Sequence, residues 1–239
     1  PKSSARDIAQ VVRTDPALTA RLIQVANSPI VRGDRKVDNI QTAVTRMGAE
    51  MVQNIVTSFL VRQLFQTKHQ GLHTRMATIW NHSAHVAAIS HVLADRFSTI
   101  KPDEAMLAGL VHDIGKLPVL AKARRMSNFE ENAHILDRVM DELHPALGKT
   151  ILETWHFEPN IIAAAAEHEN IQRDTTYLDL TDIIIVANLH SYVGKPQTKD
   201  LDWTAIPAMK KLGLDAEKSI EVLEAAHDEI VEIQNLLTK

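Results

Sequence analysis

The segment Gly109-Leu-Val-His-Asp-Ile-Gly-Lys116 carries the most informative feature of this sequence, the doublet His112-Asp113. An imidazole beside a carboxylate can hold a hard divalent metal ion when both side chains reach the same point. Neighbouring side chains of a helix point about 100° apart, so they normally face different surroundings. Gly115 is expected to end the helix in the left-handed conformation, which would bring both side chains together. The alternative is a pair of helix-capping residues, and ligands from other helices would favour the metal site.

The composition is that of a helical globular protein without thiol chemistry. The 239 residues suffice for one large domain or two small ones and for a substantial hydrophobic core. Only 4% of the residues are aromatic and only 8 are glycine, which favours helices over strands. The sequence has no cysteine, so disulfides and thiolate ligands are excluded. A metal site would use histidine, carboxylate, amide or water ligands, which suit iron, manganese, zinc or magnesium.

Charge and hydropathy argue against a nucleic-acid partner and against membrane association. The formal net charge is -4 and no block of lysine and arginine occurs, so the sequence indicates no nucleic-acid partner. No apolar run approaches the ~18 residues of a membrane-spanning helix, and the first residues lack the pattern of a signal peptide. We therefore expect no membrane association and a cytoplasmic location.

Apolar periodicity and helix-ending residues predict an all-α fold. Asp15-Pro16 and Pro102 each have the pattern of a helix start, whereas Gly48 follows a predicted helix end. His144-Pro145 is expected to open a separate helix, after one that ends near Asp141. The predicted helices cover about residues 17–26, 39–47, 49–66, 74–97, 102–113, 117–123, 145–155, 160–168, 180–192 and 215–237.

The polar stretch 66–71 is the best candidate for a boundary within the fold. We expect a two-lobed helical bundle, with lobes of about residues 1–70 and 71–239 that form a single unit over residues 1–239. Trp80 and Trp155 lie on apolar helical stripes, so both are expected in the core.

Histidine is abundant, with 12 residues, and its positions indicate convergence. The candidates for a shared site are His82, His112, His144 and His168, which lie on different predicted helices, together with Asp113. Helical proteins build metal sites from ligands that converge from several helices. His82 shares its helical stripe with Val86 and Ile89, so it should face the interior. For each histidine the alternative is a core residue that bonds to a backbone carbonyl, but the joint pattern favours a metal site.

Two motifs resemble the HD superfamily of metal-dependent phosphohydrolases. The segment 80–87, Trp-Asn-His-Ser-Ala-His-Val-Ala, is followed by the segment 110–116, Leu-Val-His-Asp-Ile-Gly-Lys. In that superfamily a first histidine, the His-Asp doublet and a later aspartate bind one or more metals. His144-Pro-Ala-Leu-Gly148 is similar to the His-Pro-x-x-Gly element of the HD-GYP branch, which hydrolyses cyclic di-GMP. Glu167-His168-Glu169 stands where that branch has His-His-Glu.

The sequence departs from that branch at two places. No Gly-Tyr-Pro follows His168, and Ile185-Val-Ala-Asn188 has an amide where the superfamily has an aspartate. An asparagine oxygen can coordinate a metal but brings no negative charge, so a divalent ion should bind more weakly. Asp15-Pro-Ala-Leu18 and Asn27-Ser28 are similar to the HDOD family, the HD-related output domains, and this resemblance covers about residues 5–195.

The HDOD resemblance implies an HD-like second lobe with a degenerate metal site. The implied ligands are His82, His112, Asp113, His144 and His168. We expect a divalent iron, manganese, zinc or magnesium ion there, or no ion at all. A second ion would have only His144, His168 and Glu167 as ligands.

The resemblance further implies a bacterial signalling or regulatory module that is non-catalytic or weakly active, with no assigned catalytic residue. Its partners would be signalling proteins or domains, with a nucleotide as a further ligand. The alternative is a metal-dependent phosphohydrolase that acts on a nucleotide or a cyclic dinucleotide. In that case Lys116 or Arg124-Arg125 would meet the phosphate charge, although these residues also fit a solvated helix face. A helical scaffold with purely structural histidines is the third interpretation.

Overall fold

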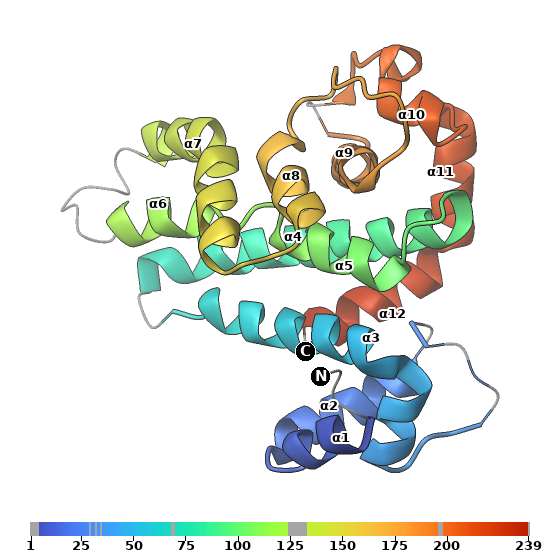
Figure 1. Cartoon of the computed structure of the whole chain (residues 1–239). Helices are drawn as coiled ribbons and strands as arrows, with labels where there is room; N and C mark the ends of the chain where they lie inside the picture. The colour runs from blue at the N-terminus through green and yellow to red at the C-terminus, as the bar shows by residue number, and fades with distance from the viewer. Residues whose placement is uncertain are drawn as a thin grey trace.

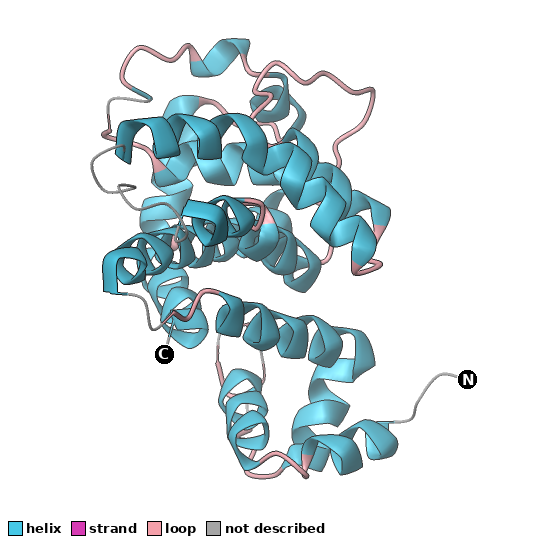
Figure 2. Ribbon diagram, turned by 90° about the vertical axis from the view of Figure 1, so that its left-hand side faces the viewer, coloured by secondary structure: helices cyan, strands magenta, loops and turns pink. Residues whose placement is uncertain are grey.

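The structure, a computed structural model, describes residues 5–28, 30–31, 33, 35–67, 70–123, 133–195 and 198–238. These residues form helices, turns and loops but no strand, as the sequence predicts (Figures 1 and 2). The helices are α1 (Ala5–Val12), α2 (Pro16–Ala26), α3 (Ile40–Leu64), α4 (Gln70–Phe97), α5 (Pro102–Val111), α6 (Lys116–Ala123), α7 (Ala133–Thr154), α8 (Pro159–Glu167), α9 (Leu180–Ser191), the 3-10 helix η2 (Trp203–Ala205), α10 (Pro207–Lys211), α11 (Ala216–Ala225) and α12 (His227–Thr238). Within the described ranges, every helix is too short or too polar to span a membrane.

Helix α3 connects the two packing regions of the fold. It begins after Asn39, whose side chain accepts a hydrogen bond from the backbone N–H of Thr42, and it is kinked at Gly48. Gly48 has a φ of 78°, a left-handed conformation that favours glycine. Figure 1 shows α1 and α2 packed on one side of α3, with α5 and α12 on the other. The helix end predicted at Gly48 is therefore present as a kink within a longer helix.

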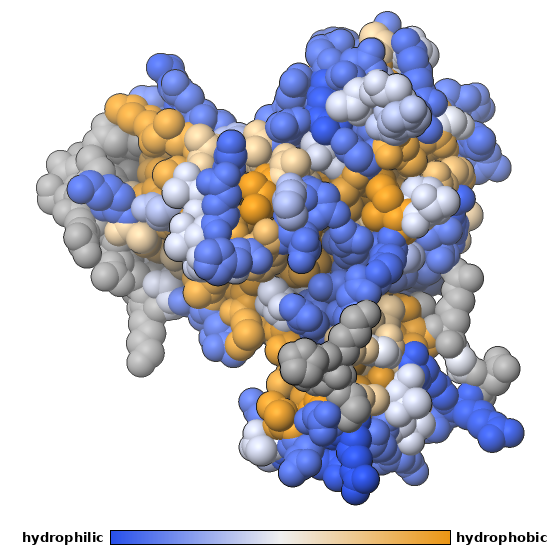
Figure 3. Space-filling model, in the orientation of Figure 1, coloured by the Kyte–Doolittle hydropathy of each residue, from blue (hydrophilic) through white to orange (hydrophobic). Residues whose placement is uncertain are grey.

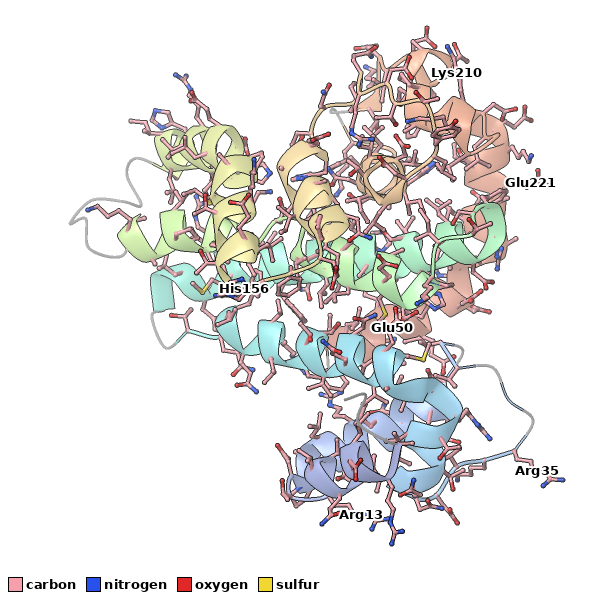
Figure 4. The ribbon with its side chains drawn as sticks, in the orientation of Figure 1. Arg13, Arg35, Glu50, His156, Lys210 and Glu221 are labelled. Carbon is pink, nitrogen blue, oxygen red and sulfur yellow. The ribbon has the colours of Figure 1, made fainter. Side chains whose placement is uncertain are left out.

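Polar contacts join α3 to the start of α5. The Nδ2 group of Asn54 donates a hydrogen bond over 2.8 Å to the buried carboxylate of Asp103. Glu50, labelled in Figure 4, lies between the two helices and forms an ion pair with Lys101 at 2.5 Å. These contacts fix the start of α5 against α3, and the C-terminal end of α5 carries the His-Asp doublet.

Helix α4 lies at the centre of the region formed by α4 to α12, which we call the larger lobe, and packs against α5, α9 and α12. Helix α9 is buried along most of its length, from Leu180 to Asn188. Its apolar run 183–186 has a high β propensity, yet it forms a helix because no neighbouring strand offers it backbone hydrogen bonds in the described parts of the chain. The packing of α9 on α4 places the end of α9 beside His82, whose Nδ1 atom lies 3.4 Å from Oγ of Ser191.

The predicted start of a separate helix at Pro145 is wrong. Helix α7 runs from Ala133 to Thr154 without interruption, so Pro145 lies inside this helix rather than at the start of a new one. Proline has no N–H group, which deprives the carbonyl oxygen of Asp141 of its helical partner. The Nδ1 atom of His144 takes this role, since it lies 3.1 Å from that oxygen.

The predicted C-terminal helix is also divided. It was expected to run over residues 215–237, but α11 ends at Ala225 and α12 begins at His227. Between them, the buried Ala226 has a φ of -99° and a ψ of 8°, so the chain turns there and α12 packs onto α4. Apolar periodicity continues through this break, so the pattern alone predicted a single helix.

Gly115 has a role other than the predicted left-handed helix end. Its φ is not positive, in contrast to that of Gly48. A Cβ atom at Gly115 would lie 2.0 Å from the carbonyl oxygen of His144 and 2.5 Å from the backbone nitrogen of Gly148. The missing side chain therefore allows the turn that follows Asp113 to touch the backbone of α7.

We predict that Gly115→Ala lowers the free energy of unfolding by about 2–3 kcal/mol, because the added Cβ would push the α7 backbone away. Gly148→Ala is the matched control, since its Cβ would meet no atom closer than 3.6 Å. Alanine in a helix interior is also more favourable than glycine by up to about 1 kcal/mol, so the Gly148→Ala protein should be at least as stable as the wild type. Urea denaturation measures both, and an unchanged Gly115→Ala protein would contradict the close approach.

The two tryptophans expected in the core differ in the structure. Trp80 is 6% exposed and packs on Phe65 with ring centroids 5.2 Å apart. Trp155 follows α7 and is 44% exposed, so its predicted core position is wrong. With Leu64 and Leu117 it lines an apolar groove of about 400 Å³, and Figure 3 shows apolar side chains at the surface below α7. The helical stripe of Trp155 thus faces this groove and solvent instead of the interior.

Alanine substitution should distinguish the two tryptophans. Trp80→Ala should lower the free energy of unfolding by about 3–5 kcal/mol, because it opens a cavity in the core. Trp155→Ala should cost less than about 2 kcal/mol, since much of the ring already contacts water. Thermal and urea unfolding of both variants provide the measurement, and equal losses would show that Trp155 is more deeply packed than its exposure indicates.

Candidate metal centre

Histidines from four helices meet in the interior of the larger lobe. His82 lies on α4, His112 caps the C-terminal end of α5, His144 lies on α7, and His168 caps the end of α8. Asp113 follows α5, lies among the four rings and is 1% exposed. All five residues that the sequence singled out are therefore adjacent, although they come from widely separated positions in the chain.

The carboxylate of Asp113 divides the histidines into two groups. Its Oδ2 atom lies 3.6 Å from Nε2 of His82 and 3.5 Å from Nε2 of His112. Its Oδ1 atom lies 3.2 Å from Nε2 of His144 and 3.7 Å from Nε2 of His168. We call His82, His112 and Asp113 the first ligand group, and Asp113, His144 and His168 the second ligand group. Within each group the potential ligand atoms lie within 4.8 Å of one another, a spacing that could hold a metal ion.

Backbone carbonyl groups determine the tautomer of three histidines. Nδ1 of His112 lies 2.7 Å from the carbonyl oxygen of Gly109, and Nδ1 of His168 lies 3.1 Å from that of Ala165. Nδ1 of His144 lies 2.9 Å and 3.1 Å from two carbonyl oxygens of α7. A carbonyl oxygen only accepts hydrogen bonds, so these Nδ1 atoms carry the proton. In their neutral form, His112 and His144 therefore direct the lone pair of Nε2 toward Asp113, the arrangement found in metal-binding histidines.

Four buried polar atoms form no hydrogen bond within the described structure. Three belong to the site, Nε2 of His82, Nε2 of His112 and Oδ1 of Asp113, and the fourth is Oδ1 of Asn188 on α9. An unpaired buried polar group costs about 1–3 kcal/mol, so such a cluster requires an explanation. All four atoms can donate a lone pair, and imidazole nitrogen with carboxylate or amide oxygen is a suitable ligand set for zinc, iron or manganese. The residues present therefore fit a divalent metal ion.

Burial holds the site in the protonation state that a metal requires. It lowers the pKa of His82 to about 4, and it also lowers the pKa of His112 and that of His144, because a charged ring would lose its hydration. Burial by itself would raise the pKa of Asp113, but electrostatic interactions with His112 and with the ammonium of Lys116 outweigh it and lower that pKa below its usual value. Neutral imidazoles around an ionised carboxylate are the form that binds a divalent ion.

Lys116 adds a positive charge on the side of the first ligand group. Its Nζ atom donates a hydrogen bond to Oδ2 of Asp113 over 2.6 Å, and its side chain is 13% exposed. The sequence suggested this lysine as a contact for phosphate, whereas in the structure it binds the shared carboxylate. Arg124 and Arg125, the other suggested phosphate contacts, lie outside the described residues.

Glu169 lies beside the site, whereas the sequence motif pointed to Glu167 as a ligand. The Oε1 atom of Glu169 lies 3.3 Å from Nε2 of His168 and 3.8 Å from Nε2 of His144. Hydrogen bonding to His168 lowers the pKa of Glu169 to about 2, so its carboxylate is ionised. Glu167 accepts a hydrogen bond from Nε of Arg173 instead. The last glutamate of the His-His-Glu element was the signal in the sequence that could have identified Glu169.

An ion-pair network holds the turn that carries Glu169. Arg173 binds Glu167 at 2.5 Å and Asp179 at 2.7 Å, and its guanidinium also approaches the fully buried Asp182. Lys211 pairs with the same Asp182 at 2.6 Å. Because Asp179 and Asp182 form the capping box of α9, the network ties the turn after α8 to the start of α9. Arg173 is thus a positioning residue for the turn beside the site.

A comparison with known protein families identifies the relatives of this chain. The model of the HDOD domain family matches residues 1–171, which is well over half of the chain. The chain belongs to the HDOD family. This membership agrees with the all-helical fold and with the resemblance of the sequence motifs.

Solved structures share the HDOD fold over the whole chain. A protein from Shewanella amazonensis SB2B, provisionally described as a metal-dependent phosphohydrolase, is 27% identical with a TM-score of 0.83, and the match covers 100% of this chain and 85% of that protein. An HDOD domain protein of unknown function from Geobacter sulfurreducens is 20% identical with a TM-score of 0.71, over 100% and 87% of the two chains. At this lower identity the likeness shows the fold alone.

A protein without an assigned function from Treponema pallidum (strain Nichols) is related over most of this chain. The two are 22% identical over 204 residues, which are 79% of this chain but only 38% of that protein. The chain therefore spans less than half the length of this relative. What the longer protein does as a whole is not evident from the shared HDOD part.

The lowered pKa values predict how metal binding depends on pH. Protons compete with a metal only when the pH approaches the pKa of the ligand, so histidines with a lowered pKa stay available below pH 6.5. We expect the affinity for Mn²⁺ to change by less than about threefold between pH 8 and pH 6, whereas ligands with ordinary imidazole pKa values would lose at least about tenfold. Isothermal titration calorimetry at constant ionic strength measures this, and a tenfold loss would contradict the prediction.

Proposed function

We propose that this chain is a regulatory HDOD module that binds a divalent metal ion and does not turn over phosphoesters efficiently. The observation that carries the proposal is the buried Asp113 carboxylate, toward which four histidines direct Nε2. The ligands would be drawn from His82, His112, Asp113, His144 and His168, and the ion would be zinc, iron, manganese or magnesium. When bound, such an ion can polarise a phosphoryl oxygen or acidify a water molecule.

The charges around the site support a regulatory function over catalysis. Phosphoester hydrolysis by two ions needs both of them fixed about 3.5–4 Å apart. Here Asn188 supplies an amide in place of a carboxylate, and Lys116 places an ammonium on the shared Asp113. A second ion would therefore meet less negative charge than in the catalytic relatives. The missing Gly-Tyr-Pro after His168 points in the same direction.

The alternative function is metal-dependent phosphoester hydrolysis of a nucleotide or a cyclic dinucleotide. It is favoured by the intact His112-Asp113 doublet and by the tautomers that direct Nε2 into the site. The Shewanella protein that is 27% identical carries a provisional description of this kind. In this alternative the chain's own Lys116 would leave Asp113 and neutralise a phosphate oxygen.

The regulatory function would be exerted through partners. We propose that signalling proteins or domains bind the module, that a nucleotide is a further ligand, and that the protein acts in the cytoplasm. A signal-transduction description, also provisional, belongs to a Marinobacter aquaeolei VT8 protein that is 19% identical with a TM-score of 0.60, over 100% of this chain and 56% of that one. That likeness supports a common fold, and the link to signalling is part of the proposal.

Metal analysis tests the proposal most directly. Protein prepared without a histidine tag, loaded with Mn²⁺ or Fe²⁺ and desalted, should retain close to one ion per chain, and Asp113→Ala should retain almost none because the shared carboxylate is lost. Less than ~0.2 ion per chain in the wild type would overturn metal binding.

A hydrolysis assay distinguishes the two functions. We expect the metal-loaded wild type to leave cyclic di-GMP and simple nucleotides uncleaved beyond the level of the Asp113→Ala control. Robust hydrolysis that disappears in Asp113→Ala would establish the phosphohydrolase alternative. Activity that persists in the variant would identify a contaminating enzyme, because the variant lacks the carboxylate shared by both ligand groups.

A further inference from the structure

We propose that an amphipathic helix of a partner protein, with lysine or arginine along its flanks, docks in a groove between α1 and α3. The groove has a volume of about 1020 Å³ and is lined by one face of α1, the start of α2 and both halves of the kinked α3. We call it the α1–α3 groove. The inference rests on the proposed regulatory function, because it specifies a class of partner, but the groove shares no residue with the His-Asp cluster.

The floor of the α1–α3 groove is apolar and open to solvent. Helix α1 contributes Ile8 and Val11, and α3 contributes Val52 and Val56, so that each pair is about one helical turn apart. Val11 is 71% exposed although it lines the groove, which is therefore a trough at the surface rather than an enclosed cavity. Sites for small molecules bury at least about 70% of the ligand surface, so an open trough of this size is better suited to a protein segment.

The shape of the α1–α3 groove matches two turns of a helix. Gly48 and Ala49 lie at the kink, and a Cβ atom on Gly48 would meet no atom of the described chain within 4 Å, so another backbone can approach closely there. From Ala49 to Val56 the wall formed by α3 is roughly 10 Å long, because a helix rises by about 1.5 Å per residue. A helix that presents apolar residues at i, i+4 and i+7 covers the same length, as in other complexes in which a helix binds a groove.

The rim of the α1–α3 groove is acidic. Asp7, Asp15 and Glu50 line it, and its lining includes no lysine, arginine or histidine among the residues that the structure describes. Oδ1 of Asp15 accepts two backbone hydrogen bonds at the start of α2, which hold this carboxylate at the rim. Glu50 is paired with Lys101, but both side chains are more than half exposed, so Glu50 can exchange this partner at little cost. Basic residues beside the apolar face of a docked helix would complement this rim.

Charge also distinguishes this partner from other occupants. The formal net charge of the chain is -4, so a second copy would be repelled on approach. The acidic rim likewise repels nucleic acid and anionic lipid surfaces. A cationic amphipathic helix is attracted by the rim and covers the apolar floor, so it gains from both features of the groove.

Two designed helical peptides test the inference. Both are fluorescein-labelled, about 14 residues long and carry leucine at i, i+4, i+7 and i+11, with lysine on both flanks in one and glutamate in the other. Fluorescence anisotropy should show that the wild-type protein binds the lysine peptide at least about tenfold more tightly than the glutamate peptide. The affinity for the lysine peptide should fall as salt is added, because the charges of the rim are exposed.

The apolar floor is tested by Val11→Gln, which should weaken binding of the lysine peptide at least about fivefold, because the peptide would otherwise cover this side chain. Leu60→Gln is the matched control, since Leu60 is 59% exposed on α3 outside the groove, and it should change the affinity less than about twofold. Both positions are exposed, so both variants should fold, and thermal unfolding checks this.

The acidic rim is tested by the double variant Asp7→Asn with Glu50→Gln, which should also weaken binding of the lysine peptide at least about fivefold. Its control, Glu221→Gln with Glu224→Gln, removes the same charge from α11, where Figure 4 labels Glu221, and should have no effect.

Three results would overturn the inference: equal losses in a variant and its matched control, equal affinity for the two peptides, or no binding of the lysine peptide at about 100 μM. A wild-type dimer in sedimentation that dissociates in Val11→Gln would also overturn it, by assigning the groove to a second copy. Binding should be the same with Mn²⁺, with EDTA and in Asp113→Ala, so the groove and the metal centre fail in different assays.

Discussion

The burial of the Asp113 carboxylate is the interaction on which the larger lobe depends. A carboxylate that is 1% exposed is stable only when positive or hydrogen-bonding groups surround it. Its partners come from α4, α5, α7 and the end of α8, each of which presents an imidazole, and from Lys116 at the start of α6. Of these groups, Lys116 compensates the charge through its hydrogen bond, whereas neutral imidazoles would do so only through a shared cation. The packing of the lobe and the chemistry of the site are therefore coupled through one side chain.

At the candidate site the sequence departs from the HD motifs that it resembles in charge more than in the positions of its residues. The helical framework superimposes on a solved structure with a TM-score of 0.83, and the histidines converge around the doublet. Asn188 brings no charge where the motif has an aspartate, and Glu167 stands in place of a histidine and binds Arg173. Lys116, which belongs to the motif, neutralises one side of the shared carboxylate. A site can thus keep the ligand geometry of an enzyme while its electrostatic potential no longer suits two ions.

Much of the fold was predictable because its signals are local. The side chains of Asp15 and Asn39 cap the helices that follow them, as their types indicate. The break at Gly48 was predicted as a helix end, and the apolar stripe of α4 and the apolar run of α9 were also evident from neighbouring residues. The members of the site could be listed because each histidine lies on a separate predicted helix and matches a family motif. Their assignment as metal ligands is still a prediction.

The amino-acid sequence alone determined the helices, their caps and the identity of the clustered residues, whereas the tertiary structure decided how they are used. Pro145 remains inside α7 because the side chain of His144 bonds to the carbonyl oxygen that proline leaves free. Gly115 is required by the backbone of α7, which is distant in sequence. Glu169 rather than Glu167 faces the histidines because Arg173 and α9 orient the turn. Each of these outcomes depends on contacts between separate elements, and local sequence patterns contain no information about such contacts.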